Sequence, residues 1–271
     1  MKIVCLIRPG APLYYFVNEL NAEYPITEVI IEKPKVYKKN IFFRLKNTGF
    51  LGLIKIFKNR FSKTARDEII FNEWFSNKWK NLNKKIPYLE VENINSELVH
   101  KRLKEIKPDL ILDHGTSIVK DKILKHSKLS LNLHWGLSPY YRGTHCTEWA
   151  LINWDINNIG VTIHSLTKYI DGGKIFAQER AKINKKDTVL SINMQLTFLG
   201  VKLIKKIIRN IRNKRKLSCE KQDYSKGFIT YHRQWNPLLE KQIEYIKKNH
   251  TIKEMLTNPS RKEYLPIKKL K

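Results

Sequence analysis

The chain has 271 residues, of which 52 are Lys or Arg and 25 are Asp or Glu, so its formal charge at pH 7 is +27. With 42% hydrophobic and 11% aromatic residues, the composition excludes wholesale disorder and predicts one large domain or a domain with a small appendage. The charge favours phosphate-bearing partners, namely nucleic acid, nucleotides, anionic lipid or a polyanionic coenzyme, although a Lys-rich composition also arises passively in an AT-rich genome.

The three Cys residues lie far apart and form no Cys-x-x-Cys pair, which predicts reduced thiols rather than a disulfide framework or a zinc site. The N-terminus lacks the apolar core of a signal peptide. No run reaches 18 apolar residues, so we expect a cytoplasmic protein without a transmembrane segment.

Short apolar runs alternate with stretches of helical periodicity, which is typical of parallel βαβ units. We predict strands over residues 2–7, 27–32, 110–113, 129–134 and 161–166, and helices over 13–20, 65–79, 96–106 and 191–211. The expected fold class is therefore α/β, with residues 1–216 as the main domain and 217–271 as a short C-terminal extension. In that extension we expect a hairpin or a helix cap before a Lys-rich tail.

Residues 33–66 interrupt this pattern, because they contain eleven basic residues, no acidic residue and many Phe, Leu and Ile side chains. One interpretation is an amphipathic helix over 50–61 that lies on a membrane surface or a partner. The other is a helix packed on its own domain. Since aromatic side chains are costly to leave in water, we expect a folded basic aromatic insertion that borders the ligand-binding cleft at the carboxyl edge of the sheet.

Polar residues cluster around the strand at 129–134. Asn132 and His134 are two residues apart, so their side chains point to the same face of that strand. Gly136 breaks the chain soon afterwards, which places both residues near the carboxyl end of the strand, where ligands bind in open α/β sheets. Asp171 precedes two glycines in a turn that can close over the same volume, and His164 lies two residues after Thr162 on the next strand.

Asn, His and Asp suit acyl transfer to an amine without a covalent enzyme intermediate. Asn132 and a protonated His134 can donate hydrogen bonds to the developing oxyanion, while Asp171 can orient His134, raise its pKa and help to relay the proton that the amine loses. Cys146 and Ser138 lack the context of an activated nucleophile. With no third ligand near His145 and Glu148, no metal site is expected.

The passage from Asn132 to Gly173 resembles the 10-formyltetrahydrofolate-dependent formyltransferases, which include sugar N-formyltransferases and methionyl-tRNA formyltransferase. The family pattern is Asn-x-His-x-(Ser/Gly)-x-x-Pro ending near Arg-Gly, then Gly-x-Thr and Asp-x-Gly. The matching residues in this sequence are Asn132, His134, Gly136, Pro139, Arg142, Gly143, Gly160, Thr162, Asp171 and Gly173. Residues 2–211 are covered by the resemblance, and 129–175 carry its specific motifs.

The resemblance implies a Rossmann-like formyltransferase fold with a mostly parallel twisted sheet flanked by helices. It implies 10-formyltetrahydrofolate as cosubstrate, bound by the loop after the fourth strand at His114, Gly115, Thr116, Ser117 and Ile118. Asn132, His134 and Asp171 are the implied catalytic residues, and we place Arg142, Gly143 and His164 at the substrate. The chain departs from the usual pattern at Trp135, Ser138 and Lys168, which leaves the acceptor pocket open.

Three acceptor hypotheses follow. A small-molecule amine on a nucleotide-linked sugar of surface polysaccharide synthesis fits a catalytic domain with a short tail. Methionyl-tRNA formyltransferase also carries a basic insertion after the second strand, but its C-terminal barrel is larger than residues 219–271, so tRNA ranks second as a partner. A phosphate- or membrane-binding protein on a decayed scaffold ranks last, because the three catalytic residues are intact. An oligomer is compatible with the sequence.

Overall fold

The computed structural model describes residues 1–33, 80–248 and 251–270. Its centre is a seven-stranded sheet with the strand order β3-β2-β1-β4-β5-β7-β8. β1 to β5 run parallel to their neighbours, whereas β7 is antiparallel to both β5 and β8. The strands are β1 (Ile3–Ile7), β2 (Glu28–Glu32), β3 (Tyr88–Val91), β4 (Leu110–His114), β5 (Leu129–His134), β7 (Gly160–Ser165) and β8 (Ile175–Arg180). The α/β prediction and the mostly parallel sheet are confirmed.

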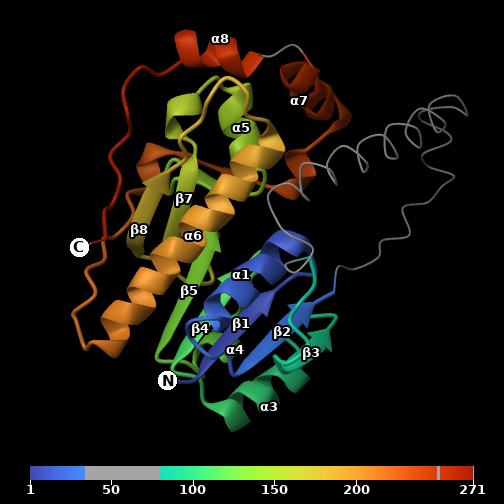
Figure 1. Ribbon diagram of the computed structural model, residues 1–271, viewed down its shortest axis with the longest axis vertical. Coiled ribbons are helices and arrows are strands. Elements are labelled where there is room, and N and C mark those ends of the chain that lie inside the picture. The colour runs from blue at the N-terminus through green and yellow to red at the C-terminus, as the bar shows by residue number, and fades with distance from the viewer. Residues whose placement is uncertain (34–79, 249–250, 271) are drawn as a thin grey trace, which may run out of the picture.

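Helices cover both faces of the sheet (Figure 1). On one face, α1 (Ala11–Asn21) and α6 (Val189–Arg212) pack on alternate strand residues such as Cys5 and Leu131. On the other, α3 (Glu97–Ile106) and α4 (Asp121–Leu124) cover the residues in between, such as Leu6. Because side chains alternate across a strand, two apolar cores form around β1, and all five of its residues are buried.

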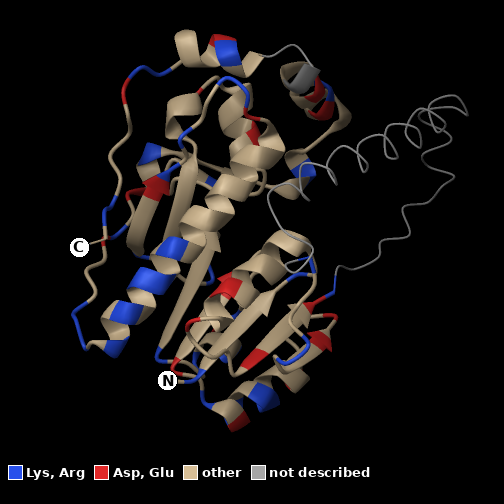
Figure 2. Cartoon of the chain, in the orientation of Figure 1, with Lys and Arg blue, Asp and Glu red and all other residues tan. Residues whose placement is uncertain are grey.

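The long helix α6 begins at a capping box, in which the Thr188 hydroxyl accepts from the Ser191 backbone N–H and the Ser191 hydroxyl accepts from that of Thr188. Figure 2 shows Lys and Arg along its exposed side. Part of this charge is neutralised within the fold, since Lys205 lies 3.4 Å from Glu19 on α1 and Arg209 lies 3.2 Å from Glu23, which follows α1. These surface pairs fix how α6 lies on α1 more than they add stability.

Several segments after β5 form a second, smaller unit beside the main sheet. A two-stranded parallel sheet joins β6 (Tyr141–Gly143) to β9 (Phe228–Thr230), and single-turn 3-10 helices lie at Ile156–Asn158, Tyr224–Lys226 and His232–Gln234. α5 (Cys146–Ile152) packs against α7 (Pro237–Lys248), which is followed by α8 (Thr251–Thr257). The predicted hairpin or helix cap is thus replaced by one strand and two helices, because Ile243 and Ile246 in α7 and Ile252 and Met255 in α8 are buried pairs at helical spacing.

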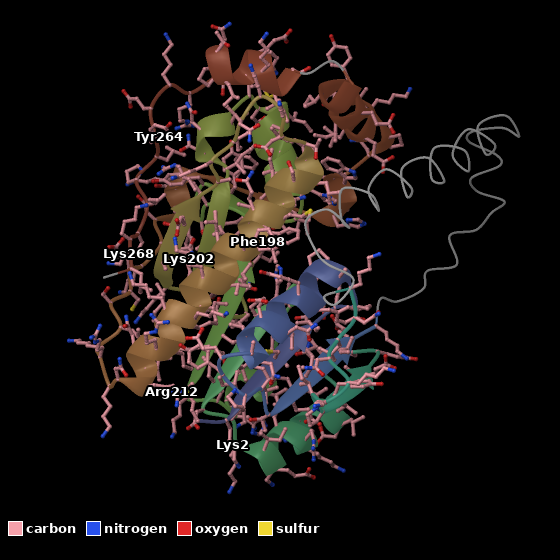
Figure 3. The ribbon with its side chains drawn as sticks, in the orientation of Figure 1. Lys2, Phe198, Lys202, Arg212, Tyr264 and Lys268 are labelled. Carbon is pink, nitrogen blue, oxygen red and sulfur yellow. The ribbon has the colours of Figure 1, made fainter. Side chains whose placement is uncertain are left out.

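The last described residues run along the free edge of β8. Gln178 donates its backbone N–H to the Lys268 carbonyl at 2.7 Å, and the Gln178 Oε1 accepts from the Lys268 N–H at 3.0 Å. The Arg180 guanidinium lies over the Tyr264 ring at 5.1 Å. Figure 3 labels Tyr264 and Lys268 in this tail, beside the sheet edge. The tail therefore covers the edge of the sheet.

Two predictions lie outside the described residues: the helix over 65–79 and, apart from Lys33, the basic insertion over 33–66. Lys33 pairs with Glu90 on β3, with Nζ and Oε2 2.6 Å apart. Within residues 1–33, 80–248 and 251–270, no helix combines the length and apolar character that a membrane span needs.

Candidate active site

The predicted site residues converge on one cavity of about 1150 Å³ at the carboxyl edge of the parallel strands. β4 and β5 supply Asp113, Asn132 and His134, while β7 supplies His164. The loop after β4 lines the cavity with His114, Gly115, Thr116, Ser117 and Ile118, the residues expected to hold the cosubstrate. Loops from β6, β7 and β9 close the remaining sides with Gly143, Thr144, His145, Asp171 and His232.

The Asp171 carboxylate is the centre of this polar cluster. Oδ1 accepts from Asn132 Nδ2 at 3.1 Å and lies 3.2 Å from His164 Nε2. Oδ2 accepts from the Gly143 backbone N–H at 2.7 Å and lies 3.4 Å from His134 Nδ1. Burial raises the pKa of Asp171, but these neighbours outweigh it and hold the pKa well below the ordinary value. Asp171 is therefore an anion at neutral pH.

The turn that carries Asp171 depends on a left-handed backbone conformation at Asp171 and on a glycine at position 173. Asp171 has φ of 43°, in the left-handed region that Asp tolerates better than most side chains. A Cβ on Gly173 would lie 1.7 Å from the Ser165 carbonyl oxygen, so only glycine fits there. Gln222, from the C-terminal extension, donates to the carbonyls of Asp171 and Gly173 at 2.7 and 2.6 Å. The extension thus fixes the turn.

The amide of Asn132 has an orientation set by this charge. Its NH₂ group must face the Asp171 carboxylate, because the reverse orientation would bring two acceptors together. Asn132 Oδ1 is consequently buried and accepts no hydrogen bond from the described residues. Such an acceptor is costly to bury alone, so it is suited to receive an N–H from a bound substrate.

His134 has one ring nitrogen fixed by the backbone. Its Nε2 lies 2.9 Å from the Tyr141 carbonyl, which can only accept, so Nε2 carries the proton and Nδ1 faces Asp171 with its lone pair. Burial lowers the pKa of His134, and the Asp171 charge opposes this only in part. Asp171 thus raises this pKa, as expected, but desolvation is the larger effect, so the pKa of His134 lies below its ordinary value.

Of the three residues placed at the substrate, one does not reach the cavity. Arg142 is buried, donates from Nε to the Pro139 carbonyl at 3.2 Å and lies over the Tyr224 ring. Gly143 and His164 do line the cavity, but both contact Asp171. The assignment of Arg142 to substrate is corrected to a packing role, since its strand turns the side chain toward the extension.

Sequence reasoning missed two buried carboxyl groups near the cosubstrate loop. Glu32 at the end of β2 accepts from the Ser117 N–H at 2.7 Å and from its hydroxyl at 2.6 Å, which holds the pKa of Glu32 below its ordinary value against the effect of burial. Asp113 accepts from the Thr116 hydroxyl. Both residues lie near the ends of apolar strands. An acidic residue at such a position is normally exposed to solvent, so the sequence alone does not indicate that these two are buried.

Aromatic rings line the opposite end of the cavity. His145, at φ of 60°, stacks on Trp235 with ring centroids 4.3 Å apart, and its Nε2 lies 3.4 Å from His232 Nδ1.

Burial raises the pKa of the Cys146 thiol, so the residue stays protonated rather than acting as a nucleophile. The ranges that the structure describes contain no group of three His, Cys, Asp or Glu residues able to hold a metal.

The fold and the cluster of polar side chains at the carboxyl ends of the strands are those of an α/β protein that binds ligands at this edge of the sheet. The chain belongs to the formyl transferase family, whose N-terminal domain pattern matches residues 62–208. It is 35% identical over 203 residues to the bifunctional polymyxin resistance protein ArnA of Wigglesworthia glossinidia brevipalpis, covering 70% of this chain and 30% of ArnA. The methionyl-tRNA formyltransferase of Azobacteroides pseudotrichonymphae is 42% identical over 82 residues, which cover 30% of this chain and 25% of that protein. The chain thus spans about a third or less of either relative.

Solved structures share the fold at low sequence identity. A 4-N formyltransferase from Francisella tularensis superposes with a TM-score of 0.54 and 19% identity, covering 91% of this chain and 87% of that one. The N-formyltransferase from Helicobacter canadensis, solved with folinic acid and dTDP-3-aminofucose, gives 0.53 and 18%, covering 87% and 73%. The Rossmann-like formyltransferase fold is therefore confirmed.

The formyl donor of this family is 10-formyltetrahydrofolate, and the cavity fits such a molecule. Its volume is ample for a drug-sized ligand. The residues of its walls include four buried polar atoms that have no partner within the described part of the chain: His114 Nε2, Asn132 Oδ1, Trp135 Nε1 and Asn193 Oδ1. Bound there, the folate supplies the formyl group.

Proposed function

We propose that the protein transfers the formyl group of 10-formyltetrahydrofolate to a primary amine, and that this amine is carried by a nucleotide-linked sugar. The observation that supports it most is the cluster in which the buried Asn132, His134 and His164 surround the partly buried Asp171 in the wall of a large cavity. A site with an anion, a base and an unpaired acceptor is suited to direct attack by an amine.

Each residue has a defined task in this proposal. The free Oδ1 of Asn132 orients the amine by accepting one of its N–H groups, while the N–H of the Asn132 amide that does not face Asp171 donates to the oxyanion. His134 Nδ1 receives the proton that the amine loses on attack, since Nε2 is held by Tyr141. Asp171, 3.4 Å from Nδ1, stabilises the resulting imidazolium, and the leaving amine of the folate takes the proton.

The preference for a sugar acceptor is supported by the relatives. The resemblance to ArnA covers most of this chain, and several structural neighbours are sugar N-formyltransferases. One of them was solved with an amino sugar linked to dTDP together with a folate. Basic side chains such as Arg8 and Lys33 line the cavity and can contact a diphosphate. Surface polysaccharide synthesis and a cytoplasmic location accord with such an acceptor.

Methionyl-tRNA is the second candidate acceptor. The 42% identity over 82 residues to a methionyl-tRNA formyltransferase favours it, as does the net charge of +27. In that case the exposed basic side of α6 would contribute to the binding of phosphates.

The test is a comparison of acceptors. The protein is mixed with 10-formyltetrahydrofolate and either dTDP-3-aminofucose or methionyl-tRNA, and the release of tetrahydrofolate is followed, with Asp171→Asn as the inactive control. We expect turnover with the amino sugar and none with tRNA. Turnover with methionyl-tRNA alone would overturn the sugar proposal and leave formyl transfer standing.

A further inference from the structure

Asp113 is a buried carboxyl group that the proposed formyl transfer does not use. It lies on β4, its side chain is 5% exposed, and it lines the cavity. β4, β5 and β7 lie side by side in the sheet (Figure 1), with Asp113 in register with Asn132 and Asn132 in register with His164. The three side chains therefore form a row on one face of the sheet, and Asp113 stands at the end nearest the cosubstrate loop.

The carboxyl group is half satisfied. Its Oδ1 accepts from the Thr116 hydroxyl, whereas no donor within residues 1–33, 80–248 and 251–270 contacts Oδ2. Because Asp113 lines the cavity, a bound ligand can donate a hydrogen bond to its carboxylate. Since Gly115 and Thr116 line the same part of the cavity, that ligand lies against the loop after β4.

The charged groups around Asp113 increase the stabilisation that its carboxylate gains when a ligand donates a hydrogen bond to it. Glu32 from β2 and Asp171 from the loop after β7 face it as anions, and His164 on β7 faces it from the other side. Burial is the largest effect and, with the two anions, raises the pKa of Asp113 to about 7, although the Thr116 hydrogen bond opposes the shift. Above that pH the group is a desolvated anion with one donor.

The pterin ring of the formyl donor offers the matching chemistry. Its pyrimidine edge carries a 2-amino group beside a ring N–H, two parallel donors with the spacing that a carboxylate accepts bidentately. We propose that Asp113 binds this 2-amino and N–H edge of 10-formyltetrahydrofolate and thereby selects the pterin; this inference rests on the folate-dependent part of the proposed function. Asp113 is then a specificity residue of the donor subsite, separate from the Asn132, His134 and Asp171 cluster.

The test measures binding of folinic acid by calorimetry without any acceptor. The wild type, Asp113→Asn and Thr116→Val are each titrated at pH 8.5 with folinic acid and with its analogue in which methyl replaces the 2-amino group. We expect the wild type to bind the analogue on the order of 30- to 100-fold more weakly, and Asp113→Asn to bind both compounds with similar low affinity, as for loss of a charged hydrogen bond. Thr116→Val, the matched control, keeps the carboxylate and therefore keeps the discrimination.

A pH series separates recognition from folding. Wild-type affinity for folinic acid should fall about tenfold per unit below pH 7, as Asp113 is protonated, and this limb should be absent in Asp113→Asn. Equal binding of both compounds by the wild type would overturn the role of Asp113 without any variant. The same discrimination in Asp113→Asn as in the wild type would overturn it too. Failure of the wild type to bind either compound would instead refute folate dependence itself.

Discussion

Asn132→Asp is the sharpest test of the site, because it changes one donor into an acceptor without changing the shape of the side chain. In the wild type, Asn132 Nδ2 lies 3.1 Å from Asp171 Oδ1. The substitution brings a second carboxylate oxygen to that position. Asn132→Ala is the matched control, since it removes the donor and adds no charge.

The size of the effect follows from the distance. Two unit charges 3.1 Å apart repel by about 5 kcal/mol at an effective dielectric constant of about 20. Keeping one proton on the pair at pH 7 costs about 4 kcal/mol, because an ordinary carboxyl pKa lies about three units lower. Keeping one proton on the pair therefore costs slightly less than the repulsion between two carboxylates. We expect one carboxyl of the pair to titrate close to neutrality.

The sign of the pH dependence is opposite to that of an ordinary ion pair. The folded Asn132→Asp protein holds a proton at a pH where the unfolded chain has lost it, so the folded-state pKa is raised. Its free energy of unfolding should therefore increase by about 3 to 4 kcal/mol relative to Asn132→Ala between pH 8 and pH 5. Urea unfolding followed by Trp fluorescence measures this difference.

Formyl transfer gives an independent measurement. Both variants should lose at least about a hundredfold in rate at pH 8, and Asn132→Asp should be the slower, because a carboxylate then faces the developing oxyanion. If the two variants show the same stability at pH 8 and pH 5 and the same rate, Asn132 does not contact Asp171 and the reasoning fails.

Three further predictions address the other parts of the site. Asp171→Asn should slow formyl transfer at least about a hundredfold and lower the pKa of His134 further, since the Asp171 charge raises it; an unchanged pKa in an NMR titration would contradict this. Gly143→Ala should lower the melting temperature by several degrees, because a Cβ there would lie 1.9 Å from the Thr230 carbonyl oxygen at φ of 96°. Gly172→Ala, where the nearest atom is 3.0 Å away, is its control, and equal melting temperatures would argue against the β6–β9 pairing. The rising limb of the formyl-transfer rate against pH should follow the pKa of the acceptor amine, since only the free base attacks. If two acceptor amines of different pKa give the same limb, the titrating group belongs to the enzyme instead.

Much of the sheet was predictable because its strands are buried on both faces. β1, β2 and β4 read as short apolar runs, and their predicted ranges agree with the structure to within a residue or two. β3 was missed, because only one of its four residues is buried and its alternation is weak. β8 was missed as well, since polar residues end its short apolar run and the tail that covers its other edge comes from a distant part of the chain.

The site was predictable where spacing along one strand fixed a common face. Asn132 and His134 needed only the two-residue period of β5, and Asp171 needed the glycines that follow it. The position of Arg142 was not predictable, since its contacts with the extension are tertiary. The same is true of Asp113, because the burial of a single acid depends on elements brought together only in the fold.

Gly143 links two regions that the sequence keeps apart. Its N–H donates to Asp171 at 2.7 Å, and the same residue pairs with Thr230 in β9. Ligand binding at Asp171 and attachment of β9 are therefore coupled through one backbone unit, and thermodynamic reciprocity requires each to change the other by the same factor. A substrate that steadies Asp171 should slow amide hydrogen exchange in β9, and a partner that loosens β9 should weaken substrate binding to the same extent.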